Sequence, residues 1–254
     1  MEELGKSFHI QFASQTLNWF GSDSAKNYEI NLKNDRERME RYNWIDQTFT
    51  YDFNEHGFRS ESFVSDQDSI VFLGASDTLG TGLPLEDTWH YKVATELKLR
   101  RYNLGLGGAS GNTTFRMASY WLSRLNPKIV VLMSPLNPRF ELAEDIGGER
   151  FYYQLGPGMW SKDSLYWGYF KDKNLKSKFK NFYQLWTASE DNLLLQQKKN
   201  ELAISKLADD IGAKFVLADG DTDWIGANVD YARDLMHFGR EGNKIVAERI
   251  LSRI

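Results

Sequence analysis

Along residues 67–254, short apolar runs alternate with segments in which apolar residues recur every three to four positions. The apolar runs predict strands at 69–73, 129–133 and 213–218, and the mixed segment 101–105 predicts a fourth strand. A strand covered on both faces needs apolar side chains on both. Uninterrupted runs such as Ile70-Val-Phe-Leu73 are therefore typical of the centre of a parallel sheet.

The segments with helical periodicity lie between and after these strands. Trp89, Val93 and Leu97 are spaced four residues apart, and a second segment up to Leu125 is followed by Asn126-Pro127, which favours a helix end. Two further helices are predicted, one from the candidate cap Ser189 to about residue 211 and one from near Glu241. This alternation predicts the α/β class, with a parallel sheet covered by helices on both faces.

The first 66 residues are more polar and less regular. Apolar and polar residues alternate over Asn27–Asn34 and over Phe49–Phe53, which predicts two strands. Asn54-Glu-His-Gly57 predicts a turn, because glycine adopts positive φ without strain. We therefore expect an extended N-terminal arm with short strands at residues 1–66, packed on a main domain at residues 67–254.

Aromatic residues crowd the segment 140–187, which is interrupted by glycines and predicted to be irregular. A segment of this length within a compact domain is usually a functional lid or a small insertion. A local core formed by the aromatic side chains is an equally good interpretation. The basic stretch Lys171–Lys180 is interpreted as a solvated helix face or loop.

Composition narrows the function classes. The chain has 254 residues, a net charge of −4 and no cysteine. A slightly acidic protein has no excess positive charge for nucleic acid, and the lack of cysteine excludes thiolate catalysis and disulfides. The N-terminus does not resemble a signal peptide, and no apolar run is long enough to cross a membrane. We expect a protein that acts inside a cell, is exported without a cleaved signal, or is carried on a virion.

Chemically informative residues follow the predicted strands or precede the last helix. They lie in Gly74–Gly82, Gly105–Asn112, Ser134–Pro138 and Asp234–Gly239. In a parallel α/β sheet these junctions meet beyond the carboxyl ends of the strands, where ligands bind. The sequence therefore predicts one site built from all four segments.

The residue types at these junctions suit nucleophilic catalysis. A serine needs a base to take its proton, and the base needs a carboxylate to fix its tautomer. Ser76, His237 and Asp234 can fill these roles. An oxyanion would need donors, for which the candidates are the backbone N–H groups of Ser76 and Gly108 and the side-chain amide of Asn137.

The order and spacing of these segments resemble those of the SGNH (GDSL-like) hydrolases over about residues 68–254. The blocks of that family correspond here to Gly74-Ala-Ser-Asp-Thr78, Gly108, Pro135-Leu-Asn-Pro138 and Asp234-Leu-Met-His237. The resemblance implies a three-layer α/β/α flavodoxin-like fold and ester hydrolysis through an acyl-serine. It assigns Ser76, Asp234 and His237 as the catalytic triad, with no metal and no cofactor.

The chain departs from the family pattern at two blocks. Ala75 replaces an aspartate that is not the catalytic acid. Pro135 and Pro138 flank Asn137 in place of glycine and aspartate, and each proline fixes φ and removes an N–H. In the arm, the segment Asn54–Ser60 resembles a segment that precedes the catalytic domain in some relatives.

Substrate class and rival functions remain open at the level of sequence. Without a strongly apolar lid helix, we expect a short acyl or O-acetyl ester, with a carbohydrate ester as the leading candidate. The alternative is a catalytically lapsed SGNH fold that binds carbohydrate or forms part of a larger assembly such as a phage particle. A nucleotide-binding enzyme is disfavoured, because residue 110 is serine where a dinucleotide loop needs its third glycine, and no P-loop is present. His9, His56 and His90 are expected to be structural. Asp77 could cap a turn or tune the site, and the structural role is favoured.

Overall fold

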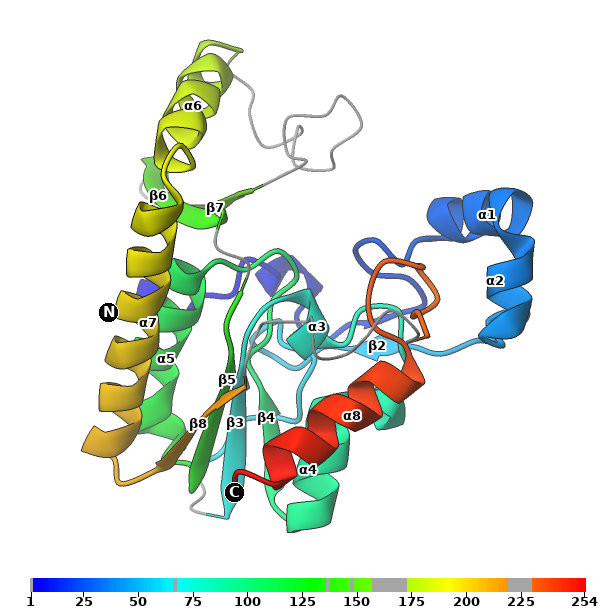
Figure 1. The fold of residues 1–254 in the computed structure, drawn as a ribbon. Helices are drawn as coiled ribbons and strands as arrows, with labels where there is room; N and C mark the ends of the chain where they lie inside the picture. Colours follow the sequence, from blue (N-terminus) through cyan, green and yellow to red (C-terminus); the bar gives the residue numbers. More distant parts are fainter. Residues whose placement is uncertain (1, 66–67, 136–137, 147–148, 157–172, 219–229) are drawn as a thin grey trace.

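The computed structural model describes residues 2–65, 68–135, 138–146, 149–156, 173–218 and 230–254 (Figure 1). In this part of the chain the centre of the molecule is a four-stranded parallel sheet in the order β4-β3-β5-β8. Its strands are β3 (Ser69–Leu73), β4 (Arg100–Asn103), β5 (Ile129–Met133) and β8 (Lys214–Ala218). All four predicted strands are confirmed to within a few residues.

Helices cover both faces of the sheet (Figure 1). Helices α5 (Gly111–Leu125) and α7 (Glu190–Asp210) pack on one face, and α4 (Trp89–Leu97) and α8 (Arg240–Leu251) on the other. Side chains alternate between the two cores, as in β3, where Val71 and Leu73 join the first and Ile70 and Phe72 the second. This arrangement is the expected three-layer α/β/α fold of the flavodoxin-like kind.

The helix ends follow local sequence. At the start of α5, Ser110 and Thr113 form a capping box, in which each side chain accepts a hydrogen bond from the other residue's backbone N–H. At its end, Asn126 takes a left-handed conformation with φ of 50° ahead of Pro127. Ser189 accepts a hydrogen bond from the Asn192 N–H and caps α7, as predicted.

The N-terminal arm contains more helix than the sequence pattern predicts. Its one strand pair in the described residues joins β1 (Thr16–Leu17) and β2 (Tyr51–Asp52), antiparallel. The other elements are the 3-10 turns Glu2–Gly5 and Ile10–Phe12 and the helices α1 (Ala25–Asn34) and α2 (Arg36–Arg41). The predicted turn after the second strand is confirmed, with Gly57 at φ of 75° and its N–H donated to Asn54 O at 3.0 Å.

The predicted strand at Asn27–Asn34 is wrong, because this segment is helix α1. Ser24 caps the helix, and Tyr28 and Leu32, one turn apart, pack against a core around Met39 and Trp44. Ile30, which made the pattern alternate, is 43% exposed. A four-residue spacing and a two-residue spacing coincide over so short a segment, and the tertiary contacts favour the helix.

The prediction of an irregular segment at 140–187 is also wrong for its described part. It forms an antiparallel hairpin, β6 (Phe140–Ile146) and β7 (Glu149–Leu155), followed by α6 (Lys173–Trp186); residues 157–172 lie outside the described ranges. Phe179, Tyr183 and Trp186 of α6 pack on Phe140 and Leu155. The described part therefore includes a local aromatic core. Residues Lys173–Lys180 of the basic stretch belong to α6.

Candidate active site

Ser76 is the first residue of the short helix α3 (Ser76–Leu79), directly beyond the carboxyl end of β3. The turn between them is tight. A Cβ on Gly74 would lie 2.1 Å from Thr78 Oγ1 and 2.8 Å from Met133 O, so only glycine fits there. The Ser76 side chain is half-buried, and its carbonyl accepts hydrogen bonds from the N–H groups of Gly80 and Thr81. The nucleophile candidate is thus fixed at the edge of the sheet.

Gly108 lies in a tight turn after β4. The N–H of Ala109 donates to Leu106 O at 3.0 Å, and Gly108, the third residue of the turn, has φ of 79°. This conformation is characteristic of a type II turn and favours glycine. Among the described residues, no acceptor takes a hydrogen bond from the backbone N–H of Ser76 or of Gly108. Both donors therefore remain available for a ligand oxygen.

Asp234 and His237 lie together in the loop before α8. His237 Nδ1 and Asp234 Oδ2 are 2.6 Å apart, and Asp234 Oδ1 accepts the backbone N–H groups of Met236 at 3.0 Å and His237 at 3.1 Å. The Asp234 side chain is completely buried, whereas the His237 side chain is 16% exposed. A carboxylate on Nδ1 places the proton there and leaves the Nε2 lone pair facing away from Asp234. The aspartate–histidine contact expected from the sequence is present.

The surroundings favour an ionised Asp234 and a basic His237. Burial raises the pKa of the Asp234 carboxyl, but the hydrogen bond and charge of His237, with the Ser22 and Met236 donors, outweigh burial and bring this pKa below its ordinary value. Burial lowers the pKa of His237. The hydrogen bond to Asp234 and the charges of Asp77 and Asp234 outweigh burial and the opposing charge of Arg139, and the pKa ends above its ordinary value.

A backbone contact joins the segment that follows α3 to the acid–base loop. Arg233 N–H donates to Gly82 O at 3.0 Å, and a Cβ on Gly82 would lie 3.2 Å from Asp234 Oδ1. Asp77, next to Ser76, is close enough for its charge to act on the imidazole. No hydrogen bond between Ser76 Oγ and His237 is present among the described residues. Such contacts are often long in unliganded enzymes.

The remaining oxyanion candidate, Asn137, lies outside the described residues. Next to it, Pro135 is buried and Pro138 half-buried, at the end of β5. Ser134 donates a hydrogen bond to Glu201 Oε1 of α7 at 2.6 Å. The flank of the third block is therefore anchored to α7, and the role of Asn137 stays a prediction.

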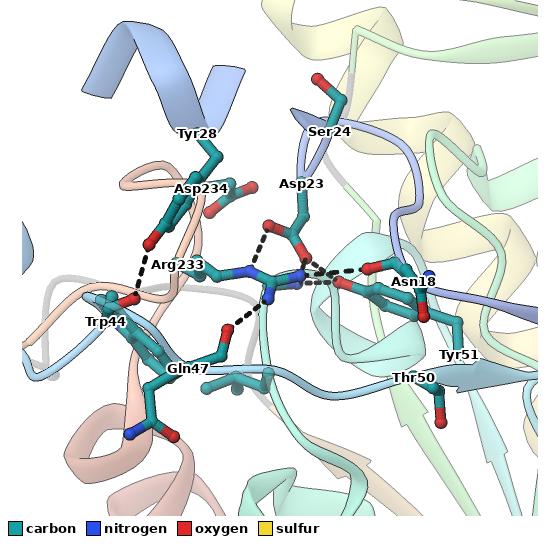
Figure 2. A network of polar contacts seen from close by, with 12 residues as sticks. Asn18, Asp23, Ser24, Tyr28, Trp44, Gln47, Thr50, Tyr51, Arg233 and Asp234 are labelled. Carbon is teal, nitrogen blue, oxygen red and sulfur yellow. Dashed lines mark hydrogen bonds and ion pairs between the residues drawn. The ribbon is translucent and has the colours of Figure 1, made fainter. Parts of the chain in front are cut away.

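The structure adds contacts that the sequence did not indicate. In the arm, Ser22 Oγ donates to Asp234 Oδ2 at 2.6 Å. Asp23 and Arg233 form a buried two-bond ion pair, with Nε–Oδ1 at 2.9 Å and Nη2–Oδ2 at 2.7 Å (Figure 2). The partners are 210 or more residues apart in sequence, so local patterns carry no signal of either contact. Motif reasoning identified Asp234 but neither arm residue.

Arg59, also from the arm, supports α3. This buried side chain donates to the carbonyls of Leu79, Gly80 and Leu83, at 3.4, 2.7 and 2.9 Å, and lies over the Tyr51 ring. Carbonyls at a helix C-terminus lack partners within the helix, and a cation satisfies them. Burial lowers the pKa of Arg59 to about 10, and the guanidinium stays charged at neutral pH.

Two other histidines are enclosed by the core. His9 is packed among phenylalanines, and burial lowers its pKa to about 3. His90 Nε2 contacts the Asn103 side chain at 3.1 Å, and burial with the charges of Arg101 and Arg59 brings its pKa well below the ordinary value. Within the described ranges, no three acidic or histidine side chains gather as metal ligands, and no helix there is long and apolar enough to cross a bilayer.

Comparisons with known proteins give matches in structure only. No family model and no curated protein matches the sequence. A structure described as a lipolytic protein of the G-D-S-L family from Desulfitobacterium hafniense DCB-2 is similar over 73% of this chain and 98% of its own, with 15% identity and a TM-score of 0.35. The psychrotrophic esterase EstA from Pseudoalteromonas sp., in a structure inhibited by monoethylphosphonate, is similar over 73% and 95%, with 12% identity and a TM-score of 0.33. At these TM-scores we base the proposed function on this chain's own residues.

Proposed function

We propose that the protein is a serine ester hydrolase with Ser76 as nucleophile, His237 as general base and Asp234 as the carboxylate that orients the base. The observation that carries the proposal is the 2.6 Å contact between His237 Nδ1 and the buried Asp234 carboxylate, in a loop whose backbone is hydrogen-bonded to Gly82 just after α3. A buried carboxylate that fixes one imidazole nitrogen leaves the other as a base.

The proposed acylation step begins when Ser76 Oγ attacks the ester carbonyl carbon while His237 Nε2 takes the hydroxyl proton. The electron pair of the carbonyl moves to its oxygen, where the N–H groups of Ser76 and Gly108 and the Asn137 amide would stabilise the negative charge. When the carbon–oxygen bond to the leaving group breaks, His237 returns its proton to the departing alcohol. The product is an acyl-serine.

Deacylation repeats this sequence with water. His237 Nε2 takes a proton from water, the hydroxide attacks the acyl carbon, and the same donors hold the oxyanion. Ser76 Oγ leaves with the proton from His237, so that one ester and one water yield one acid and one alcohol. Asp234 stays ionised throughout, which its lowered pKa supports.

For the substrate we propose a short acyl or O-acetyl ester, with a carbohydrate as the leading candidate for the alcohol part. The aromatic-rich segment 140–187 and the lack of a strongly apolar lid helix in the sequence favour a sugar or a short acyl group over a long lipid chain. A series of p-nitrophenyl esters of rising chain length, alongside acetylated polysaccharides, would test this expectation.

A fluorophosphonate probe tests the assignment of the nucleophile. We expect labelling of the folded wild-type protein at Ser76, located by peptide mass spectrometry, and no labelling of Ser76→Ala. Turnover of a short acyl ester should fall by roughly 10⁴-fold or more in that variant, because the nucleophile itself is lost. Ser69→Ala on β3 is a matched control, which should keep both labelling and turnover.

Folded protein that neither reacts with the probe at Ser76 nor hydrolyses any ester would reject the enzymatic proposal. That outcome would favour the alternative of a lapsed fold that binds carbohydrate or serves in a larger assembly. Labelling at another serine would reject the assignment of Ser76 while keeping hydrolysis.

A further inference from the structure

Two adjacent residues of the arm pair crosswise with two adjacent residues of the acid–base loop. Ser22 bonds to Asp234. Asp23 bonds to Arg233 (Figure 2). The ion pair is almost completely buried, with side chains 2% and 1% exposed. Arg233 is also enclosed by aromatic rings, with its guanidinium carbon 4.1 Å from the Trp19 centroid and 3.8 Å from that of Phe49. The ion pair therefore fixes which arm residue lies opposite each residue of the loop.

The backbone holds Ser22 rigidly. Phe20 and Asp23 exchange both of their N–H···O bonds, at 2.8 and 3.2 Å, and close a two-residue turn. Gly21, with φ of 64°, is its first central residue and Ser22 its second, as in a type II′ turn. Asn27 Nδ2 donates to Ser22 O at 2.7 Å. The Ser22 hydroxyl is therefore presented to Asp234 in one place.

The hydroxyl binds the same carboxylate oxygen as the imidazole. Asp234 Oδ2 accepts from Ser22 Oγ and contacts His237 Nδ1, both at 2.6 Å, whereas Oδ1 is held by two backbone N–H groups. The orientation of the carboxylate is thus set by the backbone. What Ser22 adds is a second donor at Oδ2, which disperses its negative charge and weakens its hold on the imidazolium.

We propose that Ser22 is a positioning residue of the acid–base pair, which tunes the basicity of His237 through Asp234 and makes the N-terminal arm part of the active site. This inference rests on the proposed function. The other charged groups that act on His237 are Asp77 of α3, whose charge raises its pKa, and Arg139, which follows β5 and whose charge lowers it. Among the described residues, the second donor to Asp234 Oδ2 comes from the arm and from none of the sequence blocks of the main domain.

The test compares Ser22→Ala with the conservative Ser22→Thr, which keeps the hydroxyl. In Ser22→Ala, Asp234 Oδ2 keeps only its contact with the His237 imidazole. The pKa of His237 should therefore rise, and the acid limb of kcat/KM should move to higher pH. At neutral pH, more of the base is then protonated, and kcat/KM should fall by about tenfold, the effect of losing one hydrogen bond to a charged group. Ser22→Thr should restore the wild-type profile.

Ser24→Ala is the matched control two residues away. Ser24 caps α1 and does not contact Asp234, so its loss should lower stability without moving the acid limb. An unshifted limb in Ser22→Ala, a shift to lower pH, or an equal shift in Ser24→Ala would each overturn the proposal.

A measurement without substrate separates this proposal from the proposed function. Proton NMR of the imidazoles, assigned by comparison with His237→Gln, reports the pKa of His237 directly. The buried His9 and His90 interfere little, since their lowered pKa values keep them neutral near pH 7. We expect this pKa to rise in Ser22→Ala even if no ester is hydrolysed. An unchanged pKa in an active enzyme would overturn the role of Ser22 and leave hydrolysis intact.

Discussion

At the scale of single residues, Asp77 is the side chain through which the nucleophile's own helix acts on the base. It follows Ser76 directly, and its negative charge raises the pKa of His237. From the sequence, Asp77 could cap a turn or tune the site, and the turn was favoured. Its electrostatic effect on the imidazole depends on how α3 meets the loop before α8, which no sequence spacing reveals.

Removing this charge should therefore lower the pKa of His237. The base works only when neutral, and activity rises as pH increases through that pKa, so we expect Asp77→Asn to move the acid limb of kcat/KM to lower pH. The direction is opposite to that expected for Ser22→Ala. Glu86→Gln is a control, because it removes one negative charge from an exposed side chain outside α3. A limb that stays in place in Asp77→Asn would show that the charge of Asp77 does not reach the imidazole.

The sequence indicated the residues of the candidate site only where they are close in sequence or follow a strand. Asp234 and His237 were identified because three residues in a tight loop bring side chains together, and Ser76 because a strand end in a parallel sheet is a known location for ligand sites. Ser22 was missed because its partner is 212 residues away. Only the fold of the arm creates that contact.

At the scale of elements, the sheet was predictable and the arm was not. Strands such as β3 and β5 are buried on both faces, so their apolar runs leave one interpretation. No residue of helix α1 is fully buried. Only Tyr28 and Leu32 pack against the core, so the sequence shows little of the apolar face that marks a helix. The hairpin β6–β7 was missed because neither strand alternates strictly between apolar and polar residues: β6 reads FELAEDI and β7 reads ERFYYQL, so no two-residue period stands out.

The arm element that carries Ser22 depends on the Asp23–Arg233 ion pair. Asp23→Asn would leave the Arg233 guanidinium buried without a countercharge, which costs about 3–5 kcal/mol of unfolding free energy. Asp35→Asn is a matched control. It breaks a half-exposed pair with Arg38, in which the Arg38 and Asp35 side chains are 33% and 35% exposed, and should cost about 1 kcal/mol or less.

Urea denaturation monitored by tryptophan fluorescence would measure both changes. Similar losses in the two variants would indicate that the buried pair is not the anchor of this element. A large loss of unfolding free energy in Asp23→Asn alone would support the buried pair as the anchor of this element.

At the scale of the whole molecule, the arm and the sheet share one set of buried contacts. Arg59 binds the end of α3, Trp44 Nε1 donates to Tyr231 O at 2.7 Å, and Asn31 Nδ2 donates to Asp234 O at 3.2 Å. Tyr51 donates to Asp23 Oδ2 at 2.6 Å and accepts from the Gly82 N–H at 2.8 Å. The division into arm and main domain describes the sequence, whereas these contacts cross it repeatedly.

We therefore expect the arm and the parallel sheet to unfold as one cooperative unit. Native-state hydrogen exchange should give the buried amides of Asp23 and Phe53 the same opening free energy as those of β3 and β5, in the range of about 5–15 kcal/mol typical of global unfolding. Helix α6 offers an internal contrast, because its aromatic residues pack on the hairpin core and Leu185 is 77% exposed. Its amides should exchange through smaller openings. Arm amides that exchange as readily as those of α6, while the sheet stays protected, would mean that the arm opens separately. Ser22 would then leave Asp234 in that open state, and the acid–base pair would lose its second donor whenever the arm detached.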